Sequence, residues 1–233
     1  MPKIIKGTVV ITLVSILIAG GYFWNILRKV ESTDPLVWES DIEVFRKADL
    51  KGHRPNHPIV LVGSSSIALY PGLEKLMQPH PIVKRGFGGA SVSDVRYYRK
   101  EIIDKHKPSK LIIYVGAIDI YYHHQGKPEH IAKLVNDLFS EIQKKNPDTV
   151  IYYIAVRPSP FQRKMWQDIE RVNEAIKQIA NKKDGINFIN ANHVVRDSNG
   201  ELIKDIYKFD ETHLNVRGNE LWWAEIKRQV FAH

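Results

Sequence analysis

Short apolar runs alternate with longer amphipathic stretches along most of the chain, which predicts parallel β-strands joined by crossover helices. The apolar runs predict strands at 59–62, 82–84, 111–115, 150–156 and 186–189. Apolar residues at helical spacing predict helices at 37–48, 92–103, 129–145, 163–182 and 217–231. We therefore expect an α/β fold, a three-layer α/β/α sandwich of the flavodoxin-like type, around a parallel sheet of about five strands.

The N-terminal residues stand apart from this alternation. Residues 7–27 carry no charged side chain, and a helix needs roughly 20 such residues to cross the hydrocarbon core of a bilayer. Basic residues flank the segment on both sides, and three aromatic residues lie near its far end, as in an interfacial belt. We interpret 1–30 as a transmembrane anchor rather than a cleaved signal peptide, because the stretch is long and no small-residue cleavage site follows it.

The chain then divides into the anchor at 1–30, a linker at 31–36 that contains Ser-Thr-Asp-Pro, and one globular domain at 37–233. The two flanks of the anchor carry nearly equal numbers of basic residues, so the positive-inside rule does not decide the orientation of the anchor. From the usual behaviour of N-terminal anchors, we expect a single-pass membrane protein whose domain lies on the extracytoplasmic side, in the periplasm or at the cell surface.

Composition narrows the candidate chemistry. The formal charge is +8, but the basic residues are scattered, so we expect no nucleic-acid partner. The absence of cysteine removes disulfides, thiolate metal sites and a cysteine nucleophile. No H-E-x-x-H motif occurs, and the adjacent His123 and His124 are poorly placed to bind one ion together, so we expect neither a metal nor another cofactor.

Polar turns follow the predicted strands, where open parallel sheets bind their ligands. The Gly-Ser-Ser-Ser turn at 63–66 can present a hydroxyl beside backbone N–H groups, although an ordinary helix N-cap has the same composition. Asp210 precedes His213 by three residues. At this spacing the carboxylate can accept the Nδ1 proton and leave Nε2 free to take a proton from serine, although capping of the last helix is the commoner reason for an isolated Asp-x-x-His.

Two further turns follow the second and third strands. The Arg-Gly-Phe-Gly-Gly turn at 85–89 lacks the G-x-G-x-x-G frame of a dinucleotide site and lies on the wrong strand for one. Its glycines allow the backbone to approach a partner closely, and a backbone N–H in such a turn could donate a hydrogen bond to an oxyanion. The third strand ends in Gly-Ala-Ile-Asp at 116–119.

The order of these pieces resembles the successive blocks of SGNH/GDSL hydrolases. The blocks are Gly-Ser-Ser-Ser-Ile at 63–67, the turn that ends at Gly89, Gly-x-x-Asp at 116–119 and Asp-Glu-Thr-His-Leu-Asn at 210–215. The similarity runs from Trp38 to the C-terminus and looks closest to the branch in which G-S-S-S-I replaces G-D-S-L. Val-Arg-Pro-Ser-Pro at 156–160 and Leu-Asn-x-x-Gly at 214–218 also look like that branch.

Carried over by position, this resemblance implies a Ser-His-Asp triad. Ser65 is then the nucleophile, with the serines on either side as register alternatives. His213 is the general base, and Asp210 is the carboxylate that orients it. The backbone N–H groups of Ser65 and Gly89 are the implied donors to the oxyanion.

One position departs from the family pattern. Where the third block of the family reads Gly-x-Asn-Asp, this chain has Ile118 in place of the asparagine that would donate to the oxyanion. Loss of one such donor typically costs about a hundred- to a thousand-fold in turnover, so we expect a slow enzyme. His123, His124 or Gln125, which are near Ile118 in sequence, are hypothetical replacement donors.

The resemblance implies a serine esterase or acylhydrolase that cleaves a carboxylic ester without a cofactor. It implies acetylated glycans, lysophospholipid-like lipids and short acyl esters as substrates, and the anchor favours an envelope glycan or a lipid. Two alternatives stay open. The acyl group can pass to a sugar hydroxyl, as in an O-acyltransferase, or the Ile118 replacement marks an impaired SGNH-fold module that binds an acylated glycan or a protein partner.

Overall fold

The structure is a computed structural model that describes residues 21, 24–52, 55–122 and 127–232. Most of the anchor predicted at 1–30 lies outside the described residues, and so do His123, His124 and Gln125. Among the residues that are described, no helix is both long and apolar enough to cross a membrane. Residues 24–31 are helical and lead into the domain.

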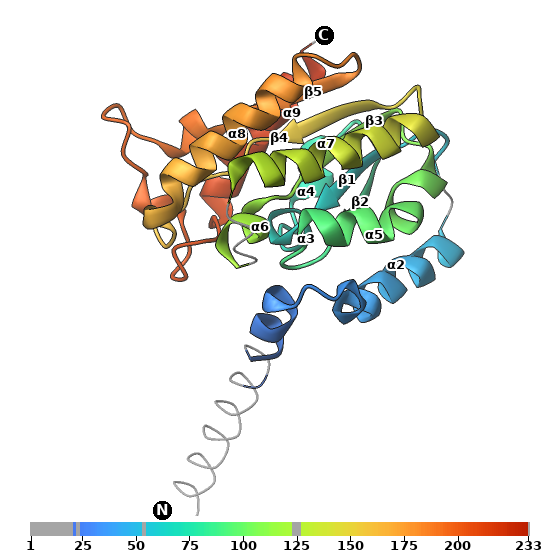
Figure 1. The fold of residues 1–233 in the computed structure, drawn as a ribbon, viewed down its shortest axis with the longest axis horizontal. Helices are drawn as coiled ribbons and strands as arrows, with labels where there is room; N and C mark the ends of the chain where they lie inside the picture. Colours follow the sequence, from blue (N-terminus) through green and yellow to red (C-terminus); the bar gives the residue numbers. More distant parts are fainter. Residues whose placement is uncertain (1–20, 22–23, 53–54, 123–126, 233) are drawn as a thin grey trace, which may run out of the picture.

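Five parallel strands form one sheet with the order β2-β1-β3-β4-β5 (Figure 1). The strands are β1 (Ile59–Gly63), β2 (Ile82–Gly86), β3 (Lys110–Tyr114), β4 (Val150–Ile154) and β5 (Ile186–Ile189). The apolar runs thus predicted every strand of this sheet, and the flavodoxin-like order is confirmed. The strand order reverses between β1 and β3, and in open parallel sheets such a switch point forms a ligand crevice at the carboxyl ends of the strands.

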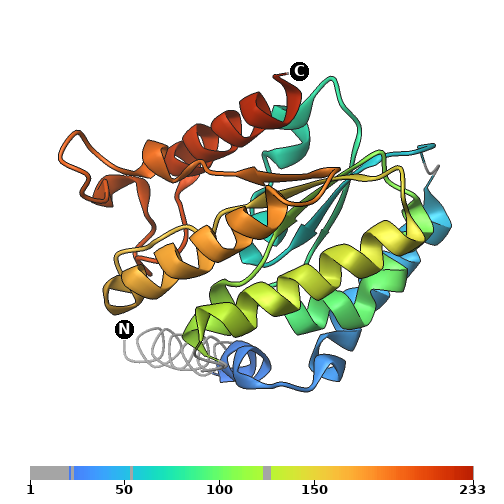
Figure 2. The same cartoon turned by 45° about the horizontal axis from the view of Figure 1, so that its top comes forward.

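Helices cover both faces of the sheet, as the α/β/α prediction requires (Figure 2). Val60 and Val62 of β1 pack toward one face and Ile59 and Leu61 toward the other, because successive side chains of a strand alternate. The first face is covered by α2 (Glu39–Lys51), α5 (Val92–Ile102), α7 (Pro128–Lys145) and α8 (Trp166–Ala180). The second face is covered by α3 (Ser65–Ala68), α4 (Leu73–Met77) and α9 (Val216–Phe231).

Short helices fill the connections. A further α-helix, α6 (Ala117–Tyr121), follows β3 directly. The 3-10 turns are η1 (Pro35–Trp38), η2 (Asp104–His106), η3 (Arg163–Met165), η4 (Asn192–Val195) and η5 (Lys204–Ile206). The first of them belongs partly to the predicted linker, yet Trp38 is buried and the Tyr98 hydroxyl donates to the Pro35 carbonyl at 3.1 Å. The end of the linker therefore packs on the domain.

Candidate active site

Ser65 lies at the carboxyl end of β1, beside the switch point of the sheet. Gly63 has a φ of +147°, and a Cβ there would overlap the carbonyl oxygen of Tyr114, so only glycine allows β1 and β3 to approach so closely. The Ser64 N–H donates to that same carbonyl at 3.1 Å. These contacts fix the turn and make Ser65 the first residue of α3.

The loop before α9 brings His213 and Asp210 to this serine. His213 Nε2 lies 2.9 Å from Ser65 Oγ, although the two residues are 148 positions apart in the chain. His213 Nδ1 lies 2.8 Å from Asp210 Oδ2. A proton on Nδ1 donated to this carboxylate leaves Nε2 free to accept the serine proton. The structure thus brings together Ser65, His213 and Asp210 in one chain of hydrogen bonds.

Asp210 also organises its own loop. Its Oδ1 accepts the backbone N–H of Thr212 at 3.0 Å and that of His213 at 2.9 Å. Burial by itself would raise the pKa of the Asp210 carboxyl, but the hydrogen bonds from His213 and Thr212 outweigh it and hold the pKa below its ordinary value. The carboxylate is therefore ionised at neutral pH and can stabilise a positively charged imidazole.

Backbone hydrogen bonds close the base of this loop. Lys208 N–H donates to the His213 carbonyl at 2.7 Å, and Asn215 N–H donates to the Ile206 carbonyl at 2.9 Å. The Asn215 side chain then caps α9 by accepting the N–H of Gly218 at 3.0 Å. The cap on α9 and these backbone hydrogen bonds fix the backbone on either side of His213.

The side chain of Arg157 also supports the loop that carries His213. The side chain is buried, its Nη2 donates to the Thr212 carbonyl at 3.1 Å, and its guanidinium lies 4.9 Å from the ring centroid of Trp222. Nearby, the Phe161 N–H donates to the Glu211 carbonyl at 3.2 Å. The segment after β4 therefore positions the His213 loop. Sequence reasoning assigned no role to Arg157, and the only signal for it was the family likeness of 156–160.

Gly89 belongs to the turn after β2, the strand that pairs with β1, and Ser65 follows the end of β1. It has a φ of +83°, and the Phe87 N–H of the same turn donates to the Gly63 carbonyl at 2.9 Å. Across the described part of the chain, no hydrogen-bond acceptor engages the backbone N–H of Ser65 or of Gly89. Neither N–H group is therefore engaged within the described residues, although the Gly89 residue itself is buried.

Ile118 lies in the first turn of α6 and is half-buried against the apolar core, so no amide occupies the position of the family asparagine. The next residue has a role that the sequence did not reveal. The buried Asp119 carboxylate accepts the backbone N–H of Val92 through both oxygens, at 3.2 and 3.1 Å. Asp119 thereby ties α6 to the residues that follow Gly89.

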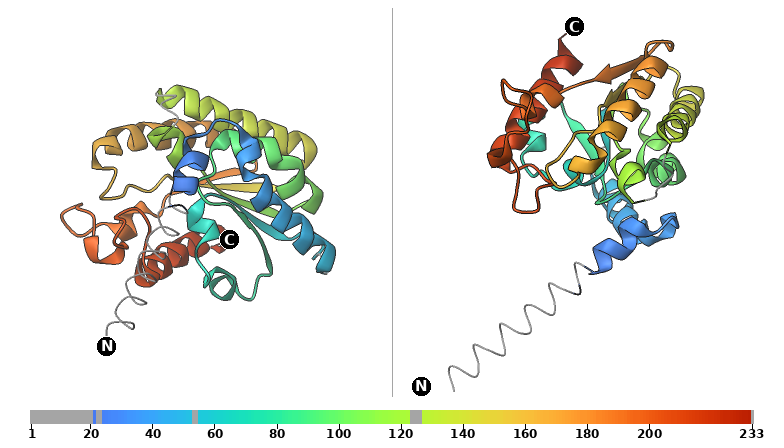
Figure 3. Two further views of the ribbon diagram at one scale, coloured as in Figure 1. Left: turned by 90° about the horizontal axis from the view of Figure 1, so that it is seen from below. Right: turned by 60° about the vertical axis from the view of Figure 1, so that its left-hand side comes forward.

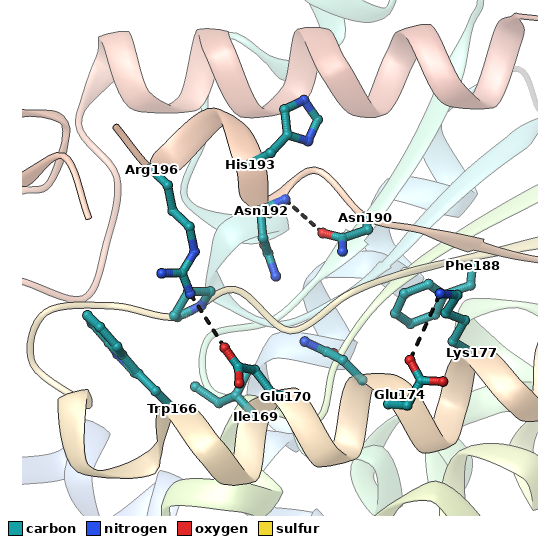
Figure 4. Close-up of a pocket in the computed structure, with 12 residues that line it drawn as sticks. Trp166, Ile169, Glu170, Glu174, Lys177, Phe188, Asn190, Asn192, His193 and Arg196 are labelled. Carbon is teal, nitrogen blue, oxygen red and sulfur yellow. Dashed lines mark hydrogen bonds and ion pairs between the residues drawn. The ribbon is translucent and has the colours of Figure 1, made fainter. Parts of the chain in front are cut away.

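A separate cleft of about 410 Å³ lies between α8 and the segment after β5 (Figure 4). Trp166, Asn192 and Arg196 are among its lining residues, and Arg196 reaches Glu170 across it at 3.8 Å. No member of the Ser65 triad lines this cleft. Within the described ranges, no group of three or more His, Asp or Glu side chains is placed to hold a metal ion.

The match to a family covers the residues of this site. The sequence profile of the GDSL-like lipase/acylhydrolase family matches residues 62–221, a range that runs from β1 to the start of α9. The chain belongs to this family. It is therefore a hydrolase of the GDSL type, as the resemblance implied. No curated protein matches its sequence.

Solved structures share the fold of this GDSL-like hydrolase. A candidate platelet activating factor from Streptococcus pneumonia superposes with a TM-score of 0.74 at 18% identity, over 93% of this chain and 99% of its own. A GDSL-like lipase from Bacteroides thetaiotaomicron gives 0.64 at 17%, over 81% and 96%. A catalytic mutant of an acetylxylan esterase from Geobacillus stearothermophilus gives 0.62 at 16%, over 77% and 97%. At these identities, the likeness establishes the fold alone.

Proposed function

We propose that this GDSL-like hydrolase is a serine esterase or acylhydrolase that cleaves a carboxylic ester with Ser65 as its nucleophile. The observation that carries the proposal is the hydrogen-bonded chain from Ser65 Oγ through His213 to Asp210. It lies at the switch point of a parallel sheet, where ligands bind in folds of this type.

The reaction proceeds through an acyl-enzyme. Ser65 Oγ attacks the acyl carbon while its proton passes to His213 Nε2, and the ionised Asp210 stabilises the resulting imidazolium. The oxyanion accepts hydrogen bonds from the backbone N–H groups of Ser65 and Gly89. When the C–O bond to the leaving alcohol breaks, His213 returns the proton to that alcohol. Water then attacks the acyl-enzyme in the same way, which releases the carboxylic acid and restores the serine.

The oxyanion side predicts a slow reaction. The side chain of Ile118 carries no donor, so two backbone N–H groups replace the set of three that the family pattern implies. The cost of one missing donor is about a hundred- to a thousand-fold in kcat. His123, His124 and Gln125, the hypothetical replacements, lie outside the described residues.

We propose an acetylated glycan or a lysophospholipid-like lipid as substrate. One of the solved structures with this fold is named an acetylxylan esterase, and that name supports the acetylated glycan. The uncharged segment at 7–27 favours a membrane or envelope substrate, and we propose that it anchors the protein with its domain on the extracytoplasmic side. Two exposed aromatic residues beside the His213 loop, Phe161 and Phe209, suit either an acyl chain or a sugar ring.

Ile118 also favours a second candidate, a catalytically impaired module that binds an acylated glycan or a protein partner without cleaving it. The triad opposes this alternative. A binding module does not need a histidine that lies 2.9 Å from a serine hydroxyl and 2.8 Å from a carboxylate. An O-acyltransferase would use the same acyl-enzyme, with a sugar hydroxyl in place of water.

Ester turnover by the full-length protein in detergent separates these possibilities. We expect hydrolysis of p-nitrophenyl acetate or butyrate by the wild type and none by Ser65→Ala. Adding a polysaccharide acceptor and analysing the products distinguishes transfer from hydrolysis. Turnover no greater than that of Ser65→Ala, in a folded sample tested over several chain lengths, would contradict the esterase and favour the binding module.

A further inference from the structure

We call the segment at 29–38 the N-terminal brace. It joins the helix at 24–31 to α2. We infer that the brace is a positioning element of the active site, in which Val30 and Trp38 hold the Gly89 turn where its N–H can reach the oxyanion. The inference rests on the proposed function, which gives Gly89 this role. Figures 1 and 3 show the start of the brace at the same end of the molecule as α3 and α6.

Val30 makes the first contact with the turn. On the same helix Trp24 is 64% exposed and Ile26 is 37% exposed, whereas Val30 is only 7% exposed, so the helix meets the domain through its last turn. A Cβ added to Gly89 would overlap Cγ2 of Val30. The valine side chain therefore lies directly against the Gly89 backbone, on the side where any other residue would carry its side chain.

Trp38 makes the second contact. A Cβ on Gly89 would lie 3.3 Å from Trp38 Cη2, and the Trp38 ring packs edge to face with Phe87 at a centroid distance of 5.6 Å. Lys29 covers the same ring, with Nζ 5.1 Å from a ring centroid, and pairs with Asp41 of α2 at 2.7 Å. Val30 and Trp38 thus both pack against the Gly89 turn, on the side where a Cβ of residue 89 would lie.

The charge of the brace also acts near α6. Burial first, and the negative charge of Glu31 second, raise the pKa of Tyr122, the residue that follows α6. Glu31 is therefore close enough to Tyr122 for its charge to be felt there. The brace therefore packs directly on the Gly89 turn, and the charge of Glu31 acts at the end of α6, the helix that carries Ile118.

The position of this turn matters more in this protein than in one with a third donor. With Ile118 in place of an amide, the Gly89 N–H is one of the two backbone donors that remain. A misplacement of about 1 Å can cost on the order of a hundred-fold in rate. Phe87 and Asp119 fix the turn from inside the domain, through Gly63 and Val92, and the brace fixes it from outside.

The test compares Val30→Ala with Ile26→Ala in the full-length protein in detergent, with the Ser65→Ala protein as background. Ile26 is a matched control, because it lies on the same helix and is exposed. We expect Val30→Ala to lower kcat for p-nitrophenyl acetate by about three- to ten-fold with KM nearly unchanged. The affinity for an alkyl boronic acid, which mimics the tetrahedral intermediate, falls in parallel. Val30→Ile, which keeps a branched side chain against Gly89, retains the wild-type kcat and boronic acid affinity. Ile26→Ala changes neither of these two quantities.

An active wild type with the same kcat in Val30→Ala would overturn the inference and leave the esterase intact. An equal loss in Ile26→Ala, or a loss that disappears on cooling below the unfolding transition, would overturn it as well, because either result indicates general destabilisation. No Ser65-dependent turnover in the wild type would instead overturn the proposed function, and the catalytic role of the brace with it.

Discussion

The two sides of the candidate active site are built differently. On the nucleophile side, Ser65, His213 and Asp210 form hydrogen bonds of 2.8–2.9 Å, and the loop that carries the last two has its own support from Arg157. On the oxyanion side, Ile118 offers no donor and two backbone N–H groups remain. Under the proposed function, the triad sets whether the chain can hydrolyse an ester, while the oxyanion side sets how fast.

The largest effect is expected on the nucleophile side. Asp210→Asn keeps the size of the side chain but removes the charge that stabilises the imidazolium and selects its tautomer. We expect kcat for p-nitrophenyl acetate to fall by about a thousand- to ten-thousand-fold. Asp168→Asn on the exposed side of α8 is the control and should leave kcat unchanged. A small loss in Asp210→Asn would show that the triad is not the catalytic unit.

The oxyanion side should respond in the opposite direction. Ile118→Asn restores an amide at the position of the missing donor, and we expect kcat to rise by about a hundred-fold. Because Ile118 is half-buried against the core, the same change should lower thermal stability, so turnover is measured well below the melting temperature. Ile118→Val, which adds no donor, should give no gain. Unchanged turnover in a folded Ile118→Asn protein would mean that a donor is not what limits the rate.

A smaller effect is expected from the support under the loop. Arg157→Lys keeps the positive charge but loses the planar group that both stacks on Trp222 and donates to the Thr212 carbonyl. We expect kcat to fall about ten-fold with KM little changed, since the lysine no longer fixes the His213 loop. Arg163→Lys, at an arginine that also lies over a tryptophan but is exposed, is the matched control. Equal effects in both variants would contradict a positioning role.

The smallest effect concerns pH. The pKa of Asp210 is lowered in the folded protein, so this group stabilises the fold above its unfolded pKa of about 3.9, and the contribution is lost as pH falls through the lower folded value. At about pH 5 the melting temperature of the wild type should therefore exceed that of Asp210→Asn. The margin should shrink below about pH 4. Thermal unfolding of both proteins between about pH 5 and pH 3 checks this prediction, and a margin that grows as the pH falls over that window would reverse the assigned shift.

The fold could be predicted because the central strands β1, β3 and β4 are buried on both faces, so each of them is an apolar run in the sequence. Every residue of β1 is buried, and even β2, at an edge of the sheet, was found from its apolar residues and the glycines that follow. Helices α5, α7 and α9 lie within one residue of their predicted bounds. Short helices such as α3 and α6 were missed, because they contain too few residues to show a helical period.

The site was open to prediction only through the family resemblance. Ser65 and His213 are 148 positions apart, and no local pattern states that they meet. Arg157 and Asp119 act through backbone groups of distant segments, so their roles depend on tertiary packing that residue type does not reveal. Val30 was assigned to the anchor, and its contact with Gly89 appears only when the chain is folded.

Covalent labelling tests the central claim, that Ser65 is an activated nucleophile, most directly. Intact-mass spectrometry after treatment with a fluorophosphonate should show a single adduct on the wild type and on Ser64→Ala and Ser66→Ala. It should show none on Ser65→Ala and slow labelling of His213→Ala, in which the serine has lost its base. A folded wild type that stays unlabelled, or an adduct that persists in Ser65→Ala, would contradict the account.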